Sequence, residues 1–187
     1  MILSNTAIVK AIKERKIIIE PHPEAAQFSQ SALDLRVGML FMQWKKSLRG
    51  AELSFDLSAV TIQSYGEYTV PVRPESDGRI KLPANGFMLA MTLETIRLKY
   101  TSRLAARVEG RSSYARLGLQ VHMTAPTIHC GFEGPIVLEL KNCGEHPLLI
   151  TPGQTCICQL IFEEVKSKPT GSFNSDFLRQ IDPLGRH

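Results

Sequence analysis

The chain has 187 residues, of which 43% are hydrophobic and 21% are charged, and its 22 basic and 18 acidic side chains leave a formal charge of +4. This composition is typical of one globular domain and excludes a disordered, collagen-like or coiled-coil chain. The charge is too mild for a nucleic-acid groove and favours a small anionic ligand, while no apolar run approaches the ~18 residues that span a bilayer. Basic residues between positions 10 and 16 interrupt any signal-peptide core, so we expect a cytoplasmic protein that binds neither nucleic acid nor membrane.

The first elements predicted are a short helix and a strand. Ser4 or Asn5 is suited to cap a helix whose apolar residues at positions 7, 8, 11 and 12 share one face. Residues 29–38 (SQSALDLRVG) then read as a strand that places Asp34 and Arg36 on one face. These two side chains either form a structural ion pair or serve a ligand, and the ion pair is the favoured interpretation.

The middle of the chain is rich in short β-type runs. Residues 39–72 contain LFMQW, ELSFDL, AVTI and EYTVPV without a sustained helical period, which predicts a compact antiparallel sheet. Residues 74–83 form a turn-rich connection, and residues 86–98 are candidates for a pair of strands. Trp44 fits a core or interface position better than a stacking platform.

The last strands precede a change of composition. Residues 135–141 (PIVLELK) alternate as a strand, and a Pro-Gly turn at 152–153 separates it from another strand at 156–162. Beyond residue 165 the sequence is rich in Lys, Ser, Gly, Asn and Pro. We therefore expect one domain over residues 1–165 and a mobile tail over 166–187 that could close over a ligand.

The four cysteines allow three interpretations: disulfides, a zinc site, or buried and inert thiols. A cytoplasmic chain makes disulfides unfavourable. Cys156 and Cys158 are two apart on one face of a strand, and no CxxC pair occurs. Buried or inert thiols are favoured.

Two histidines also invite a metal or acid-base interpretation. His122 lies between Val121 and Met123 in an expected strand, where a hydrogen-bonded core histidine is favoured. His129 and Cys130 with Cys143 could supply three zinc ligands, but their spacing matches none of the usual zinc motifs.

Residues 108–139 contain the densest set of chemically useful side chains. Residues 111–117 suit a short helix that Gly118 ends, with Ser112 and Arg116 on one face. The unpaired backbone N–H groups at such a helix start could bind phosphate. A serine-capped surface helix explains the same pattern equally well.

Glu139 is a carboxylate between apolar neighbours in a predicted strand. A carboxylate is costly to bury unless it is paired or used, which makes Glu139 a candidate general base. The alternative is a half-exposed strand glutamate beside Lys141.

Several of these segments together resemble one known family. GRSSYARLGLQVH, TAPTIHCGFEGPIVLELKN, PGQ and QLIF, with SALDLRVG nearer the N-terminus, resemble the dCTP deaminase branch of the dUTPase-like superfamily over nearly the whole chain. The resemblance implies a mainly β fold, a distorted β-barrel of jelly-roll character with a short N-terminal helix and a short central helix. It also implies a homotrimer with active sites between subunits, and hydrolysis of dCTP to dUTP and ammonia, which feeds dUTP and dTTP synthesis.

The same resemblance assigns roles to individual residues. Glu139 would exchange protons with the water that attacks C4 of cytosine, Arg116 would orient it, and Ser112 with the backbone carbonyl of Ala125 would hold the water. The triphosphate would arrive with Mg²⁺, no zinc would be used, and dTTP is a candidate feedback inhibitor. The substrate-binding residues implied are Arg111, Ser112, Ser113, Arg116, Thr124, His129, Val137, Gln159 and Gln180.

Three rival functions remain open. A dUTPase, or a bifunctional enzyme that gives dUMP, shares the fold, but a dUTPase uses an aspartate where this chain has His129 and usually lacks a glutamate at position 139. A catalytically silent nucleotide-binding regulator is suggested by His129 and by Asp176, which stands where the family's tail carries a lysine. A zinc-dependent cytidine deaminase would need HxE and PCxxC motifs that this chain lacks.

Overall fold

The computed structural model of the chain describes residues 1–45, 55–58, 66–170 and 178–185. Most of the named elements are strands, and the helices among them are short. In chain order they are α1 (Asn5–Lys13), β1 (Ile17–Glu20), η1 (Ala25–Gln27), β2 (Leu33–Trp44), β3 (Thr69–Pro71), β4 (Ile80–Leu82), β5 (Phe87–Leu98), η2 (Tyr100–Ser102), β6 (Leu104–Gly110), α3 (Ser112–Ala115), β7 (Leu119–Gln120), β8 (Thr127–Ile128), β9 (Glu133–Asn142), β10 (Leu148–Ile150) and β11 (Cys156–Glu164).

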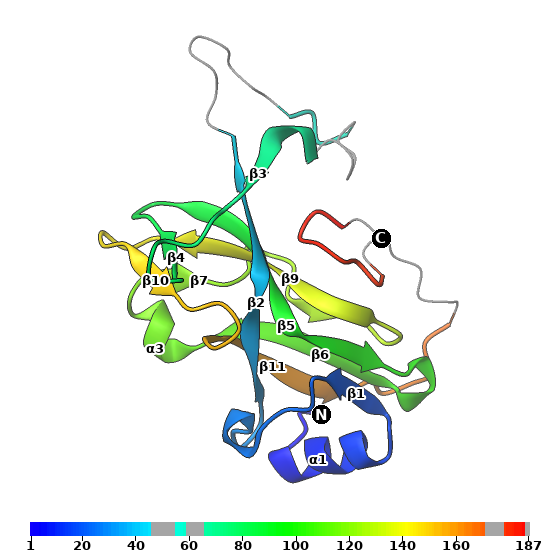
Figure 1. The fold of residues 1–187 in the computed structure, drawn as a ribbon. Helices are drawn as coiled ribbons and strands as arrows, with labels where there is room; N and C mark the ends of the chain where they lie inside the picture. The colour runs from blue at the N-terminus through cyan, green and yellow to red at the C-terminus, as the bar shows by residue number, and fades with distance from the viewer. Residues whose placement is uncertain (46–54, 59–65, 171–177, 186–187) are drawn as a thin grey trace.

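One large antiparallel sheet organises the domain. Its strands follow the order β7-β9-β5-β2-β11-β6-β8, with β1 paired to β5 and β3 paired to β2, while β10 and β4 pair separately. The sheet is strongly curled, and β2 crosses it between β5 and β11 (Figure 1). This confirms the expected mainly β, barrel-like fold with a short N-terminal helix and a short central helix.

Alternation along the long strands builds the core. In β9, Leu138 and Leu140 are fully buried, while the intervening Val137 and Glu139 are only partly buried. Strand β2 contributes Leu33 to the same core. Burying each such leucine contributes about 1.5–3 kcal/mol, so the core fixes which face of β9 carries Glu139.

Helix α1 forms as the sequence predicts. Ser4 is the N-cap and its Oγ accepts a hydrogen bond of 3.4 Å from the Ala7 amide. Ile8 and Ala11 are buried, and Lys10 lies in the last turn, where its positive charge is favourable beside the negative end of the helix dipole. The helix covers one end of the sheet beside β1 (Figure 1).

The middle of the chain differs from the sequence prediction in two places. Residues 86–98 do not form a pair of strands, because β5 runs through them as one strand of 12 residues. The run EYTVPV is only partly extended: residues 66–68 are helical and β3 begins at Thr69. The runs ELSFDL and AVTI fall largely outside the described residues.

Within the described part of the chain, no helix is both long and apolar enough to cross a membrane.

Candidate functional site

Glu139 lies on the outer face of β9, where strand alternation places it. Its side chain is half-buried, and its Oε2 accepts a hydrogen bond of 3.3 Å from the backbone amide of Met123. Lys141, two residues on, donates instead to the carbonyl of Asn85 at 2.6 Å. Within the described residues the carboxylate therefore has one donor, which leaves most of its hydrogen-bonding capacity for a ligand.

The loop that supplies this donor also holds two other predicted site residues. Thr124 and Ala125 are exposed and directly follow Met123, between β7 and β8. Because the Met123 amide is bonded to Glu139, the loop is held close to the carboxylate. The role expected of the Ala125 carbonyl beside Glu139 stays a prediction.

His122 differs from its prediction. It follows β7 rather than lying in a strand, and its buried Nδ1 has no hydrogen-bond partner among the described residues. The expected hydrogen-bonded strand histidine is therefore wrong in its secondary structure and in the bond to this nitrogen.

Helix α3 presents the predicted phosphate-binding side chains to solvent. Ser112, Ser113 and Arg116 are all exposed, and within the described residues none of their side chains has a hydrogen-bond or ion-pair partner. The helix spans Ser112–Ala115 only, shorter than the expected 111–117. Gly118, with φ of +90°, ends the turn that follows the helix, not the helix itself as expected.

Arg111, at the N-cap of α3, is held much more firmly than its neighbours. Its Nη1 donates to the carbonyl of Cys156 at 3.1 Å, and its Nη2 lies 3.3 Å from Asp34 Oδ2. Its guanidinium also lies over the ring of Tyr114, 5.5 Å from the ring centroid. Nearby, Gln159 Nε2 donates to the carbonyl of Gly110 at 3.1 Å.

The end of α3 is joined to β9 through glycines. A Cβ built on Gly118 would lie 2.4 Å from the Gly144 amide, and one on Gly144 would lie 2.6 Å from the carbonyl of Leu117. The Cys143 amide donates to the Gly118 carbonyl at 2.8 Å in the same contact. The turn after β9 and the end of α3 thus meet backbone to backbone.

The single chain does not bring all predicted catalytic residues together. Among the described residues, no hydrogen bond or ion pair links Glu139 to Arg116 or Ser112. Val137 shares the outer face of β9 with Glu139.

His129 and Gln180 lie in other parts of the fold than Glu139 and α3. His129 is exposed after β8, in a cavity of about 280 Å³ that Tyr100 and Cys130 also line. Gln180 is 4% exposed, and its Nε2 donates to the carbonyl of Pro135 at 3.0 Å, while its Oε1 has no partner among the described residues. No observation of the structure tests their predicted contacts with substrate, which stay predictions.

Parts of the predicted tail contact the domain. Tyr100 Oη donates to the carbonyl of Pro169 at 2.7 Å, and the Arg179 amide donates to the carbonyl of Glu133 at 2.7 Å. The segment 178–185 lies beside the start of β9 (Figure 1). Asp176 lies outside the described residues.

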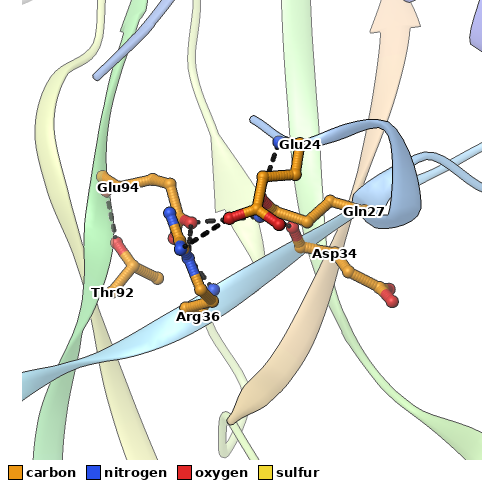
Figure 2. A network of polar contacts seen from close by, with 6 residues as sticks. All are labelled: Glu24, Gln27, Asp34, Arg36, Thr92 and Glu94. Carbon is orange, nitrogen blue, oxygen red and sulfur yellow. Dashed lines mark hydrogen bonds and ion pairs between the residues drawn. The ribbon is translucent and has the colours of Figure 1, made fainter. Parts of the chain in front are cut away.

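The predicted pair of Asp34 and Arg36 is wrong. Arg36 Nε instead lies 2.8 Å from Oε1 of Glu94, a fully buried carboxylate that also accepts 2.8 Å and 3.0 Å bonds from the Arg36 amide and Gln27 Nε2. Asp34 points away from this cluster (Figure 2) and pairs with Arg111. Residues i and i+2 of a strand share a face but need not touch, and both true partners come from segments distant in the sequence: β5 for Glu94 and the N-cap of α3 for Arg111.

Sequence reasoning missed Glu94 altogether, and it missed Arg111 as the partner of Asp34. Glu94 stands in an apolar run, MTLETI, and Asp34 stands between Leu33 and Leu35. An acidic residue inside a core strand is itself the signal, since its charge requires a partner. The sequence does not reveal which arginine supplies it.

All four cysteines are free thiols, of which Cys130 and Cys158 are buried and Cys143 is exposed. Burial raises the pKa of the Cys158 thiol far above its usual value, which keeps it protonated and unreactive. In the described part of the chain, no group of three or more His, Cys, Asp or Glu side chains is placed to hold a metal ion.

Known proteins resemble this chain over nearly all of its length. Relatives called "dCTP deaminase, dUMP-forming" in Methanosphaera stadtmanae and Methanothermobacter thermautotrophicus are 36% and 39% identical, in each case over 97% of this chain and 91% of the relative. A relative called "dCTP deaminase" in Halorubrum lacusprofundi is 35% identical over 89% of this chain and 79% of its own.

The fold also matches a solved structure. A 2'-deoxycytidine 5'-triphosphate deaminase from Agrobacterium tumefaciens superposes with a TM-score of 0.64 at 20% identity, covering 87% of this chain but 47% of that one. This supports the fold alone. The profile of the dCTP deaminase-like family matches residues 2–165, and together with the relatives above it shows that the chain belongs to the dCTP deaminase-like family.

Proposed function

We propose that the protein hydrolyses the 4-amino group of dCTP, with Glu139 as the general acid and base. The observation that carries the proposal is the placement of Glu139: a half-buried carboxylate on β9 whose single donor in the described part of the chain is the Met123 amide. Membership of the dCTP deaminase-like family and relatives named for this reaction support the same substrate.

The chemistry needs one proton carrier. As water attacks C4 of cytosine, Glu139 takes a proton from it, and the carboxylic acid so formed gives a proton to the departing amine. One water and one dCTP then yield one dUTP and one ammonia. The carbonyl of Ala125, held near Glu139 by the Met123 bond, and the Ser112 hydroxyl are the groups proposed to hold the water.

The site needs more than one copy of the chain. Ser112 and Arg116 have exposed, unpartnered side chains within the described residues and do not contact Glu139 of the same chain. We therefore place them beside Glu139 of a neighbouring subunit in a homotrimer, with the Mg²⁺ that the triphosphate carries as part of the substrate.

Mixing two inactive variants tests this arrangement. Glu139→Gln and Arg116→Gln subunits, unfolded and refolded together, would form intact sites wherever the two kinds meet in the right order. A random trimer would recover about a quarter of wild-type turnover per site. Recovery no greater than the sum of the two variants alone would contradict shared sites.

A second product is supported by the relatives themselves. Several of those most similar to this chain are called dUMP-forming. A bifunctional enzyme would add a second water at the phosphate chain and release pyrophosphate, so that dCTP would give dUMP.

One assay separates these outcomes. Purified protein is incubated with dCTP and Mg²⁺, and nucleotides are resolved by anion-exchange chromatography while ammonia and pyrophosphate are measured enzymatically. dUTP with ammonia supports simple deamination, and dUMP with pyrophosphate supports the bifunctional enzyme. Tight dCTP binding without any product would support a silent regulator and overturn the proposal, and the same assay with added dTTP tests feedback inhibition.

A further inference from the structure

Arg111 is fixed by three separate parts of the fold. Its guanidinium contacts a carboxylate of β2 (Asp34), a carbonyl of β11 (Cys156) and an aromatic ring of α3 (Tyr114). Its side chain is 33% exposed, so part of the cationic group still reaches solvent. Within the described residues, its polar partners are Asp34 and the Cys156 carbonyl. The guanidinium has five N–H donors, so some remain for an anion.

Asp34 has no other use within the described residues. Its side chain is 15% exposed, and Arg111 is the one partner of its carboxylate there. Figure 2 shows the side chain directed away from Arg36 and Glu94, whose own ion pair is complete without it. A carboxylate this deeply placed destabilises the fold unless it is paired, so the pair with Arg111 fixes both side chains.

The strand register places Asp34 in line with the start of α3. Asp34 lies opposite Gln159 of β11, and Gln159 lies opposite Glu109 of β6, immediately before Gly110 and Arg111. The Gln159 side chain bonds the carbonyl of Gly110. One row of residues across β2, β11 and β6 therefore holds both the backbone and the side chain of this turn.

We propose that Asp34 is a positioning residue that holds the Arg111 guanidinium ready for the phosphates of the nucleotide, a role that rests on the proposed function and deepens it. A free arginine side chain loses rotamer entropy when it orders around a ligand. The pair with Asp34 orders the Arg111 side chain when the protein folds. Nucleotide binding then loses less free energy to ordering that side chain. Asp34 touches Arg111 and not the substrate.

A competing effect has the opposite sign. The negative charge of Asp34 also neutralises part of the Arg111 charge, which weakens its attraction for phosphate. If charge neutralisation outweighed ordering, removal of Asp34 would strengthen nucleotide binding. The two effects therefore predict opposite changes in KM.

The experiment compares Asp34→Ala, Asp34→Asn and a matched control in the full-length protein. Asp34→Asn keeps an acceptor for Arg111 but removes the charge. The control is Glu163→Ala, which breaks a comparable ion pair between β11 and β6, where Glu163 Oε1 lies 2.8 Å from Arg107 Nη2. Turnover of dCTP, the Kd of inorganic tripolyphosphate by calorimetry and the melting temperature are measured for each.

Positioning predicts that Asp34→Ala raises the KM for dCTP and the Kd for tripolyphosphate about tenfold, with kcat within about twofold of wild type. Asp34→Asn should recover most of this loss, and Glu163→Ala should lower the melting temperature without changing KM. An unchanged KM and Kd in Asp34→Ala, or tighter binding in both Asp34 variants, would overturn the proposal.

If Asp34→Ala does not fold, Asp34→Glu replaces it. That variant keeps the charge but moves the carboxylate by one methylene, so positioning requires it to bind tripolyphosphate more weakly than Asp34→Asn, and the reverse order overturns it. Failure of the proposed function is distinct. A wild-type protein that binds tripolyphosphate but does not deaminate dCTP would refute the function, while weakened binding in Asp34→Ala would still support positioning.

Discussion

Glu94 and Glu139 lie on neighbouring antiparallel strands, β5 and β9, and the fold treats them in opposite ways. Glu94 is fully buried and accepts hydrogen bonds from the amide and guanidinium of Arg36 and from Gln27 (Figure 2). Glu139 is half-buried and accepts one bond, from Met123. A carboxylate whose two oxygens both accept hydrogen bonds from the fold stabilises the structure, whereas one that keeps most of its acceptor sites open is available for proton transfer.

The largest effect should come from replacing Glu139. Glu139→Gln keeps the shape and the acceptor for Met123 but cannot take a proton, so kcat for dCTP deamination should fall about 10³-fold, or about 4 kcal/mol in the barrier. Stability should change little, because the side chain is half-buried with one bond. Steady-state ammonia release measures the loss, with Glu163→Gln as the control. Retained turnover in Glu139→Gln would remove Glu139 from the mechanism.

The next effect concerns Glu94 and appears in stability instead of turnover. Glu94→Gln leaves the Arg36 charge without its buried partner and should lower the free energy of unfolding by about 3 kcal/mol. Urea unfolding measures it. Glu24→Gln is the control, because Glu24 is 73% exposed and lies 3.4 Å from the same arginine, so its loss should cost below ~0.5 kcal/mol. Equal losses in the two variants would mean that burial does not distinguish these pairs.

A smaller effect should appear in the pH dependence of stability. Burial raises the pKa of Asp34 above its ordinary value, and Arg111 opposes that shift only in part. The native state then binds this proton more tightly than the unfolded chain, so the contribution of Asp34 to stability falls as pH rises from about 4, its unfolded pKa, through the native pKa. Asp34→Asn should lack this component.

Urea unfolding of both proteins across that pH range gives the difference. The stability of Asp34→Asn relative to wild type should rise with pH over this window. A difference that stays constant, or falls, would show that the pKa of Asp34 is not raised in the native state.

The last prediction is that a chelator of transition metals has no effect on turnover. If Glu139 activates water without a transition metal, 1,10-phenanthroline should leave dCTP turnover unchanged, whereas EDTA should stop it until Mg²⁺ is restored. Metal analysis of the purified protein accompanies the assay. Inhibition by phenanthroline that added zinc reverses would show that the reaction needs a transition metal, as in the zinc-dependent cytidine deaminases, and would contradict the metal-free role of Glu139.

Local pattern was enough to predict the strands that build the site. The alternation of PIVLELK predicted the face of β9 that carries Glu139, and Ser4 marked a helix start correctly. Gly118 ends the turn that follows α3, not the helix itself, which stops at Ala115. These features depend on neighbours within a few residues. The assembly of Glu139 with Ser112 and Arg116 was expected from the family resemblance and not from the local pattern.

Pairing between distant segments could not be predicted in the same way. Arg36 bonds Glu94, which lies 58 residues later in the chain, and Asp34 pairs with Arg111, which directly follows β6. Several arginines and glutamates of the chain could satisfy a buried charge equally well, and only the register of β2 with β5 and β11 selects among them.

The meeting of Gly118 with Gly144 has a mechanical consequence. Since no side chain separates the two backbones, the spacing between α3 and the strand that bears Glu139 is set by atoms common to every amino acid. Substitutions elsewhere in the core can shift side chains without altering that spacing. A methyl group added at either glycine would instead act as a wedge. It would shift α3, which serves one proposed intersubunit site, relative to the strand that carries Glu139 for another.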